Sequence, residues 1–137
     1  MHPKLELTKN WLLKAFRDLE SAEKLAGGTN PFLDTGIYHC QQAAEKAIKA
    51  YLIYSEQDFE KTHNIIRLLE LAVKFSDEFK KLENEGILLT PYATEFRYPE
   101  EIYLEPDRKE YNEAYLSAKK IFDTIVSILP KEIHPTV

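Results

Sequence analysis

Residues 38–49 read Tyr-His-Cys-Gln-Gln-Ala-Ala-Glu-Lys-Ala-Ile-Lys, and they lie within a longer stretch, 30–55, that organises the chain. Asn30 suits the cap of a helix and Pro31 suits its first turn. A helix of about 24 residues would be roughly 36 Å long, which predicts the central rod of a small bundle. Its apolar residues recur at the three- and four-residue spacing of one helical face: Ile37, Cys40, Ala44, Ala47, Ile48, Tyr51 and Leu52.

The same helix carries a second, polar face. Its members are spaced by four, three and four residues and therefore stack in one column: Tyr38, Gln42, Glu45 and Lys49. His39 and Lys46 lie beside this column. Glu45 and Lys49 have the spacing of an ordinary surface ion pair, which contributes about 0.2–0.5 kcal/mol. The alternative is a polar site in which Gln42 and Glu45 hydrogen-bond a ligand or a partner, and spacing alone is compatible with both interpretations.

Composition limits the classes of function. The 137 residues form one domain, 1–137, that is long enough for its own core, with 44% hydrophobic and 30% charged residues. The net charge of −5 argues against broad electrostatic binding to duplex DNA or to an anionic membrane. The single cysteine, Cys40, lies on the apolar helical face, so we expect it to be a core residue. Because it has no partner for an internal disulfide, we also expect a reducing compartment. With no apolar span and no signal peptide in the sequence, we expect a cytoplasmic protein.

The remaining helices are predicted from caps and apolar spacing. A first helix begins at Thr8 and ends at the pair Gly27-Gly28. A third helix begins with Thr62 as its cap and His63 in its first turn, and it extends to Phe75 or Ser76. A short amphipathic continuation then stops at Gly86.

The last third of the chain predicts a short helix and then a long one. The short helix spans Pro91 to about Arg97 and is followed by an acidic loop, 100–106. The long helix is capped by Asp107 and stopped by Pro130. The sequence thus predicts an all-α fold, an antiparallel up-and-down four-helix bundle with one additional short helix.

Motifs for cofactors and metals are missing from the sequence. The four glycines make neither a phosphate-binding loop nor a dinucleotide fingerprint, and the four histidines lack the spacing of metal ligands. We therefore expect no cofactor and no metal. The alternative is a zinc site assembled across helices from His39, Glu45 and His63.

Two polar residues near helix ends are candidates for function. His63 is either a surface or capping residue, or a group that meets an anion at a helix N-terminus. Arg97 precedes Tyr98 and Pro99 at a predicted helix end. Its guanidinium group would either hold that corner to Glu45 or Glu95, or receive a phosphate.

These pieces together resemble a known family. The helix at 38–52, then Thr-His-Asn at 62–64, then Arg-Tyr-Pro at 97–99, resemble the HEPN domain family of small prokaryotic helical proteins, from about residue 11 to residue 129. The resemblance implies a four-helix bundle with a short extra helix, usually a homodimer, with a role near nucleotides or RNA. It also implies a partnership with a minimal nucleotidyltransferase in toxin–antitoxin-like pairs.

Catalytic members of that family are metal-independent ribonucleases with an Arg, four to six intervening residues and a His. Four arginines are present, and a histidine follows none of them at that spacing: Arg17, Arg67, Arg97 and Arg108. The acid–base and phosphate-stabilising roles therefore lack obvious carriers, which argues against an enzyme.

The leading hypothesis is a non-catalytic module that binds a nucleotide or single-stranded RNA, or docks a nucleotidyltransferase. One alternative is a ribonuclease that brings His63 and Arg97 together in space. Another is a purely structural protein whose polar column is a dimerisation or partner surface. In the leading hypothesis Lys46, Lys49 and Arg97 face phosphate, Tyr98 stacks on a base, and Gln42 and Glu45 orient them. The predicted ligand-binding residues are Gln42, Glu45, Lys46, Lys49, His63, Arg97 and Tyr98.

Overall fold

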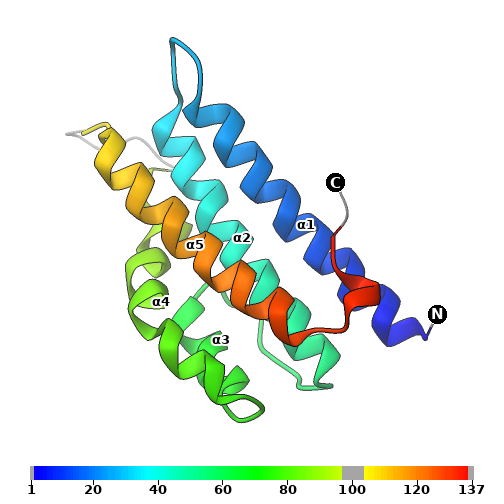
Figure 1. The fold of residues 1–137 in the computed structure, drawn as a ribbon. Coiled ribbons are helices and arrows are strands. Elements are labelled where there is room, and N and C mark those ends of the chain that lie inside the picture. Colours follow the sequence, from blue (N-terminus) through cyan, green and yellow to red (C-terminus); the bar gives the residue numbers. More distant parts are fainter. Residues whose placement is uncertain (1, 97–103, 136–137) are drawn as a thin grey trace.

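Three long helices form the body of the computed structural model (Figure 1): α1 (Pro3–Ala26), α2 (Leu33–Tyr54) and α5 (Arg108–Ile128). The structure describes residues 2–96 and 104–135 of the chain. α1 runs antiparallel to both α2 and α5 in Figure 1. α2 packs against α1, α5 and the shorter α3, so the central position predicted for it is confirmed.

Short helices occupy the remaining position of the bundle. They are α3 (Ile65–Ala72) and α4 (Glu83–Leu89), together with the 3₁₀ segments η1 (Asp77–Leu82), η2 (Thr90–Ala93) and η3 (Lys131–Ile133). α3 and α4 lie on the side of α5 away from α1 (Figure 1). All regular secondary structure in the described residues is helical, which confirms the predicted all-α bundle. The predicted third helix is the shorter α3, and the short continuation predicted after it is η1 followed by α4.

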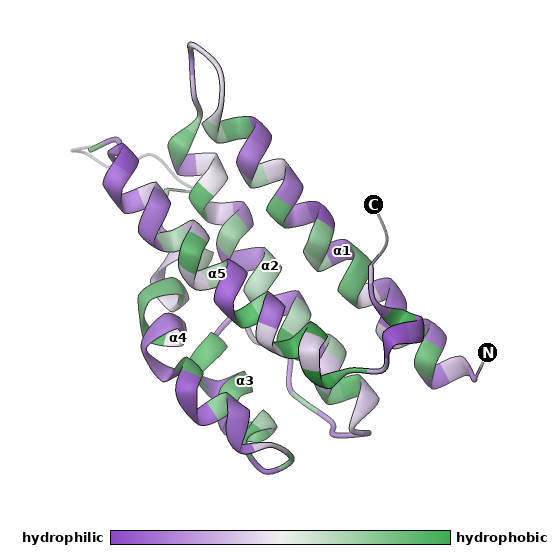
Figure 2. Cartoon of the chain, in the orientation of Figure 1, coloured by the Kyte–Doolittle hydropathy of each residue, from purple (hydrophilic) through white to green (hydrophobic). Residues whose placement is uncertain are grey.

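Burial follows the apolar stripes of the sequence. α2 is buried along most of its length, including Ile37, Cys40, Ile48 and Leu52, each with 0% exposure. In Figure 2, hydrophobic residues alternate with hydrophilic ones along α1 and α5, as expected for helices that bury one face. Such burial contributes about 25 cal/mol per Å² of apolar surface, so the stripes account for the packing of α1 and α5 on α2.

The observed helix starts correct three predictions. Thr8 lies inside α1 and its hydroxyl donates to the carbonyl of Lys4 at 2.8 Å, because the helix already begins at Pro3. Asn30 and Pro31 precede α2, whose cap position is Phe32. Asn64, rather than Thr62, caps α3, and its side chain accepts a hydrogen bond from the amide of Arg67 at 3.3 Å. His63 therefore lies just before α3 and not in its first turn.

The later boundaries agree in part. Asp107 caps α5 by accepting a hydrogen bond from the amide of Glu110 at 2.8 Å, as predicted, and α5 ends before Pro130. Gly86, predicted as a stop, lies inside α4 and is buried. The helix predicted from Pro91 to Arg97 is the shorter η2, and Arg97 itself lies outside the described residues. Apolar spacing identified these segments, whereas their exact ends depend on packing between helices.

No helix within the part of the chain that the structure describes is both long enough and apolar enough to cross a bilayer.

Candidate functional site: a polar ledge on α2

The polar face of α2 is built around a buried carboxylate. Glu45 Oε1 accepts hydrogen bonds from Gln41 Nε2 at 3.1 Å and from His63 Nδ1 at 2.9 Å, and its Oε2 accepts one from Lys49 Nζ at 2.9 Å. Glu45 is 3% exposed, Gln41 0% and Lys49 8%. The Glu45–Lys49 pair is therefore buried, which overturns the interpretation of an ordinary surface ion pair. We call the surface formed by Gln42, Glu45, Lys46, Lys49 and His63 the ledge.

Lys49 is held between its carboxylate and two aromatic rings. Its ammonium group lies 6.0 Å from the ring centre of Trp11 and 5.7 Å from that of Phe59. A cation over an aromatic face is stabilised by the ring quadrupole. The Lys49 side chain is only 10% exposed, which leaves little of it open to a phosphate, the ligand predicted for it. In this geometry Lys49 balances the charge of Glu45.

His63 is the exposed end of this network. Its side chain is 61% exposed, although the ring is fixed by Glu45. Gln41 Nε2 also donates to the backbone carbonyl of His63 at 3.1 Å, so α2 holds both the ring and the main chain. Because a carboxylate only accepts, Nδ1 of His63 must donate. Nε2 is then a hydrogen-bond acceptor or base when the ring is neutral, and a donor when the ring is protonated.

A second carboxylate joins α1 to the same face of α2. Asp18 on α1 accepts hydrogen bonds from His39 Nδ1 at 2.8 Å and from Lys46 Nζ at 2.7 Å. Asp18 is 8% exposed, and the side chain of Lys46 is 27% exposed. Asp18 thus fixes Lys46 at the edge of the ledge while part of the Lys46 side chain stays accessible.

Two residues of the site were missed at the sequence level. Gln41 bridges Glu45 and His63, and its Oε1 accepts a hydrogen bond from Gln42 Nε2 at 2.7 Å. The spacing 41, 45, 49 is a signal that would have identified Gln41 on the column of Glu45. No sequence signal identifies Asp18, because its partners lie 21 and 28 residues further along the chain.

Arg97 and Tyr98, the other two predicted residues, lie outside the described residues. Their approach to Glu45 or to the ledge stays a prediction. The five remaining residues are Gln42, Glu45, Lys46, Lys49 and His63. The structure brings Glu45, Lys49 and His63 into direct contact, and it connects Gln42 to them through Gln41.

The histidines do not assemble the alternative zinc site. His39 is bound to Asp18, whereas His63 is bound to Glu45 on a separate network. Within residues 2–96 and 104–135, no group of three His, Cys, Asp or Glu side chains is placed to hold a metal ion. The two carboxylate–imidazole pairs therefore act as hydrogen-bonded pairs.

Cys40 lies on the opposite, apolar side of α2. It has 0% exposure, which confirms its prediction as a core residue. Burial, assisted by the negative charge of Asp18, raises the pKa of its thiol to about 12. A buried thiol of this kind is inert as a nucleophile.

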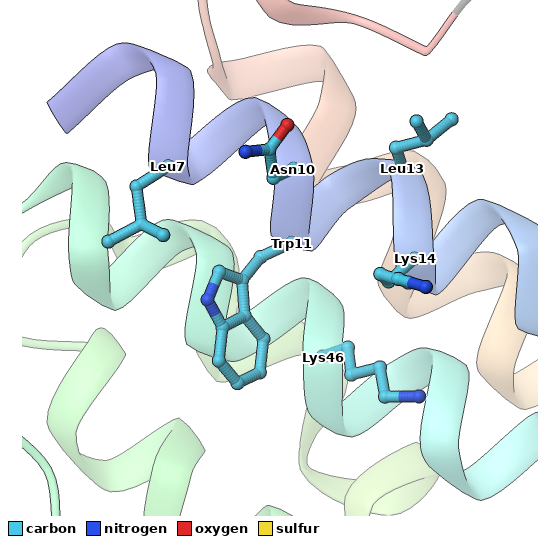
Figure 3. A pocket seen from close by; sticks show the side chains of 6 residues that line it. All are labelled: Leu7, Asn10, Trp11, Leu13, Lys14 and Lys46. Carbon is cyan, nitrogen blue, oxygen red and sulfur yellow. The ribbon is translucent and has the colours of Figure 1, made fainter. Parts of the chain in front are cut away.

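A groove on α1 adjoins the ledge. It has a volume of about 560 Å³, and its lining residues are Leu7, Asn10, Trp11, Leu13, Lys14 and Lys46. Figure 3 shows the indole ring of Trp11 projecting from α1 toward α2, with Lys46 on α2. Lys46 therefore belongs to both the groove and the ledge. None of the α1 residues that line this groove is among the predicted ligand-binding residues.

Comparison with known families now places the fold. The HEPN domain profile matches residues 8–129. The chain belongs to the HEPN domain family. The crystal structure of an archaeal HEPN homologue superimposes on this HEPN chain with a TM-score of 0.67 and 24% sequence identity, covering 88% of this chain and 95% of that one. No curated protein matches this HEPN sequence.

Proposed function

We propose that this HEPN domain is a non-catalytic module that binds a nucleotide or short single-stranded RNA at the ledge. The observation that carries the proposal is the buried Glu45, which holds Lys49 and His63 at 2.9 Å each. Burying a carboxylate costs desolvation free energy even when three donors bond to it, and a purely structural surface does not require that cost. Its effect is to present the exposed ring of His63 in one orientation.

The ledge offers donors suited to phosphate. Lys46 is partly exposed beside the Asp18 carboxylate, and protonated His63 donates through Nε2. Charge-assisted hydrogen bonds from such groups to phosphate are roughly twice as strong as neutral ones. In the proposal, Arg97 adds a forked contact to phosphate and Tyr98 stacks on the base. Glu45 orients His63 and contacts no phosphate, since two negative groups would repel.

Isothermal titration calorimetry with ATP and the other nucleoside triphosphates tests this proposal on the full chain. We expect measurable heat with the unaltered protein and at least a tenfold weaker affinity for Lys46→Met. Lys119→Met is the matched control, because Lys119 is a lysine on α5 whose ion-pair partner among residues 2–96 and 104–135 is Asp123, at the surface. The absence of heat at millimolar nucleotide would rule out the hypothesis that the ledge binds a free nucleotide.

A metal-independent ribonuclease is the second candidate, and one observation favours it. Glu45 fixes Nδ1 of His63 and leaves Nε2 in a position to accept a proton, as a general base requires. The missing Arg-to-His motif argues against it. Purified protein would then cleave RNA in EDTA, and His63→Ala would abolish the cleavage. Unchanged cleavage in that variant rejects His63 as a catalyst.

The structural alternative uses the same surface as a dimer seam. Members of the HEPN family often form dimers, and we propose a homodimer here as well. Sedimentation of Glu45→Ala against the unaltered chain tests whether the ledge is the seam, because an unchanged dimer places the interface elsewhere. Docking of a minimal nucleotidyltransferase is the remaining version of the proposal. Copurification of the two proteins, lost in Lys46→Glu, would support docking at the ledge.

A further inference from the structure

The groove on α1 has the composition of a site for a flat, anionic ligand. Its two leucines are unusually open for large apolar residues, with Leu7 48% and Leu13 42% exposed. Leu7 lies on the same side of α1 as Trp11, whereas Leu13 points away from the indole ring in Figure 3. The two charged residues of the lining are Lys14 and Lys46. None of the six lining residues is acidic. An indole ring with an exposed leucine and two lysines nearby complements a base and its neighbouring phosphates.

Trp11 contacts the charged network of the ledge. The ammonium group of Lys49 lies over its ring, and Lys49 is fixed in turn by Glu45 at 2.9 Å. The indole therefore borders the same network that orients His63. Stacking of a base on an aromatic side chain contributes about 1–3 kcal/mol, and it tolerates any sequence because every base has a π-face.

The lysines of the groove differ in their partners. Lys46 Nζ is bonded to Asp18 at 2.7 Å, so part of its charge is already neutralised. Lys14 is exposed, and among the described residues no ion pair or hydrogen bond is found for its side chain. Lys14 therefore supplies the uncompensated positive charge of the groove, and Lys46 connects the groove to the ledge.

We propose that the Trp11 groove takes one unpaired base of a single-stranded nucleic acid, whose backbone passes Lys14 and Lys46 and continues onto the ledge. This inference rests on the proposed function and defines its ligand as an oligonucleotide. A duplex keeps its bases stacked inside the helix, out of reach of Trp11. The net charge of −5 also disfavours a duplex, which demands many phosphate contacts.

The protein contains its own reporter for this test, because Trp11 is the only tryptophan in the chain. The full chain is titrated with an eight-nucleotide oligoadenylate RNA, with its DNA counterpart and with an eight-base-pair duplex, while tryptophan emission is recorded. We expect both single strands to quench the emission and the duplex to leave it unchanged. Comparing the titrations with RNA and with DNA shows whether the protein contacts the 2′-hydroxyl groups.

Variants test the two contributions separately, with a fluorescein-labelled octanucleotide followed by anisotropy. Trp11→Leu should weaken binding by about 5- to 150-fold, the equivalent of the 1–3 kcal/mol of one stacked base. Trp11→Phe, which retains a ring, should recover most of that loss. Lys14→Met should reduce the slope of log K against log salt by about 0.7, the value for one phosphate contact on a single strand. Phe75→Leu, at an exposed aromatic residue outside the groove, is the control and should change nothing.

The outcomes separate this inference from the function on which it rests. If ATP gives heat but neither single strand quenches the emission, the proposed binding of a base in the Trp11 groove is refuted, and nucleotide binding at the ledge still stands. Single-strand binding that is unchanged in Trp11→Leu also refutes base binding in the groove. If Trp11→Leu changes the protein from dimer to monomer in light scattering, the groove belongs to a subunit interface, and the proposed base-binding role is refuted as well. If neither ATP nor an oligonucleotide binds, both proposals fail.

Discussion

Replacing Glu45 by Gln removes the charge that the buried ammonium group of Lys49 needs. Gln keeps the size of the side chain, but it has one acceptor oxygen where Glu45 uses two. The Glu45 and Lys49 side chains are only 4% and 10% exposed, so water does not replace the lost partner. Removing one member of a buried pair costs about 3–5 kcal/mol, because the other charge is left buried and uncompensated.

The same helical spacing occurs in a solvated pair, which provides the matched control. Lys119 Nζ lies 2.6 Å from Asp123 Oδ1, also four residues apart, with side chains 44% and 55% exposed. Exposed pairs at this spacing contribute about 0.3–0.5 kcal/mol. Asp123→Asn should therefore change the free energy of unfolding by about 0.5 kcal/mol or less.

Urea unfolding followed by circular dichroism measures both effects. With a slope of about 1.5 kcal/mol per M, Glu45→Gln should lower the midpoint by about 2–3 M, and Asp123→Asn by no more than about 0.3 M. Glu45→Leu combined with Lys49→Met removes both charges and should recover most of the loss. If Glu45→Gln and Asp123→Asn shift the midpoint equally, Glu45 is solvated and the ledge does not contain a buried ion pair.

Three further predictions concern the core and the helix ends. Cys40 should resist thiol reagents until the protein unfolds. Burial raises the pKa of its thiol from 9.0 to about 12, so the thiol ionises at lower pH in the unfolded chain than in the folded one. The free energy of unfolding should therefore fall as the pH rises from 9 to 12, and it should fall less in Cys40→Ala. Gly36→Ala should lower the free energy of unfolding by no more than about 2 kcal/mol: an added Cβ would lie 3.1 Å from the Tyr111 ring, an overpacking cost of about 1–3 kcal/mol that the higher helix propensity of alanine offsets by about 1 kcal/mol. Calorimetry would measure the change. Asp107→Ala should lose about 1 kcal/mol in urea unfolding through the α5 cap, whereas Asp107→Asn should lose little.

The sequence predicted the parts of the fold that depend on one helix at a time. The apolar spacing around Cys40 and Ile48 identified α2 and its central place, and Asp107 was a correct cap because capping is a contact between residues three apart. The starts of α1 and α2 were misplaced. α1 begins earlier because His2 caps it locally, accepting a hydrogen bond from the amide of Lys4 at 3.0 Å. Near the start of α2, the amide of Phe32 donates to the carbonyl of Leu25 on α1 at 2.7 Å, a contact that no local pattern specifies.

For the candidate site, the sequence by itself determined which residues share a face of α2. Helical periodicity places Glu45 and Lys49 in one column. Only the tertiary structure decided that this column is buried, that Asp18 reaches Lys46 from α1, and that His63 closes onto Glu45 from a later loop. The physical reason is that burial and contacts between distant segments depend on how whole helices pack, and a local pattern of residue types does not specify which helix covers which face.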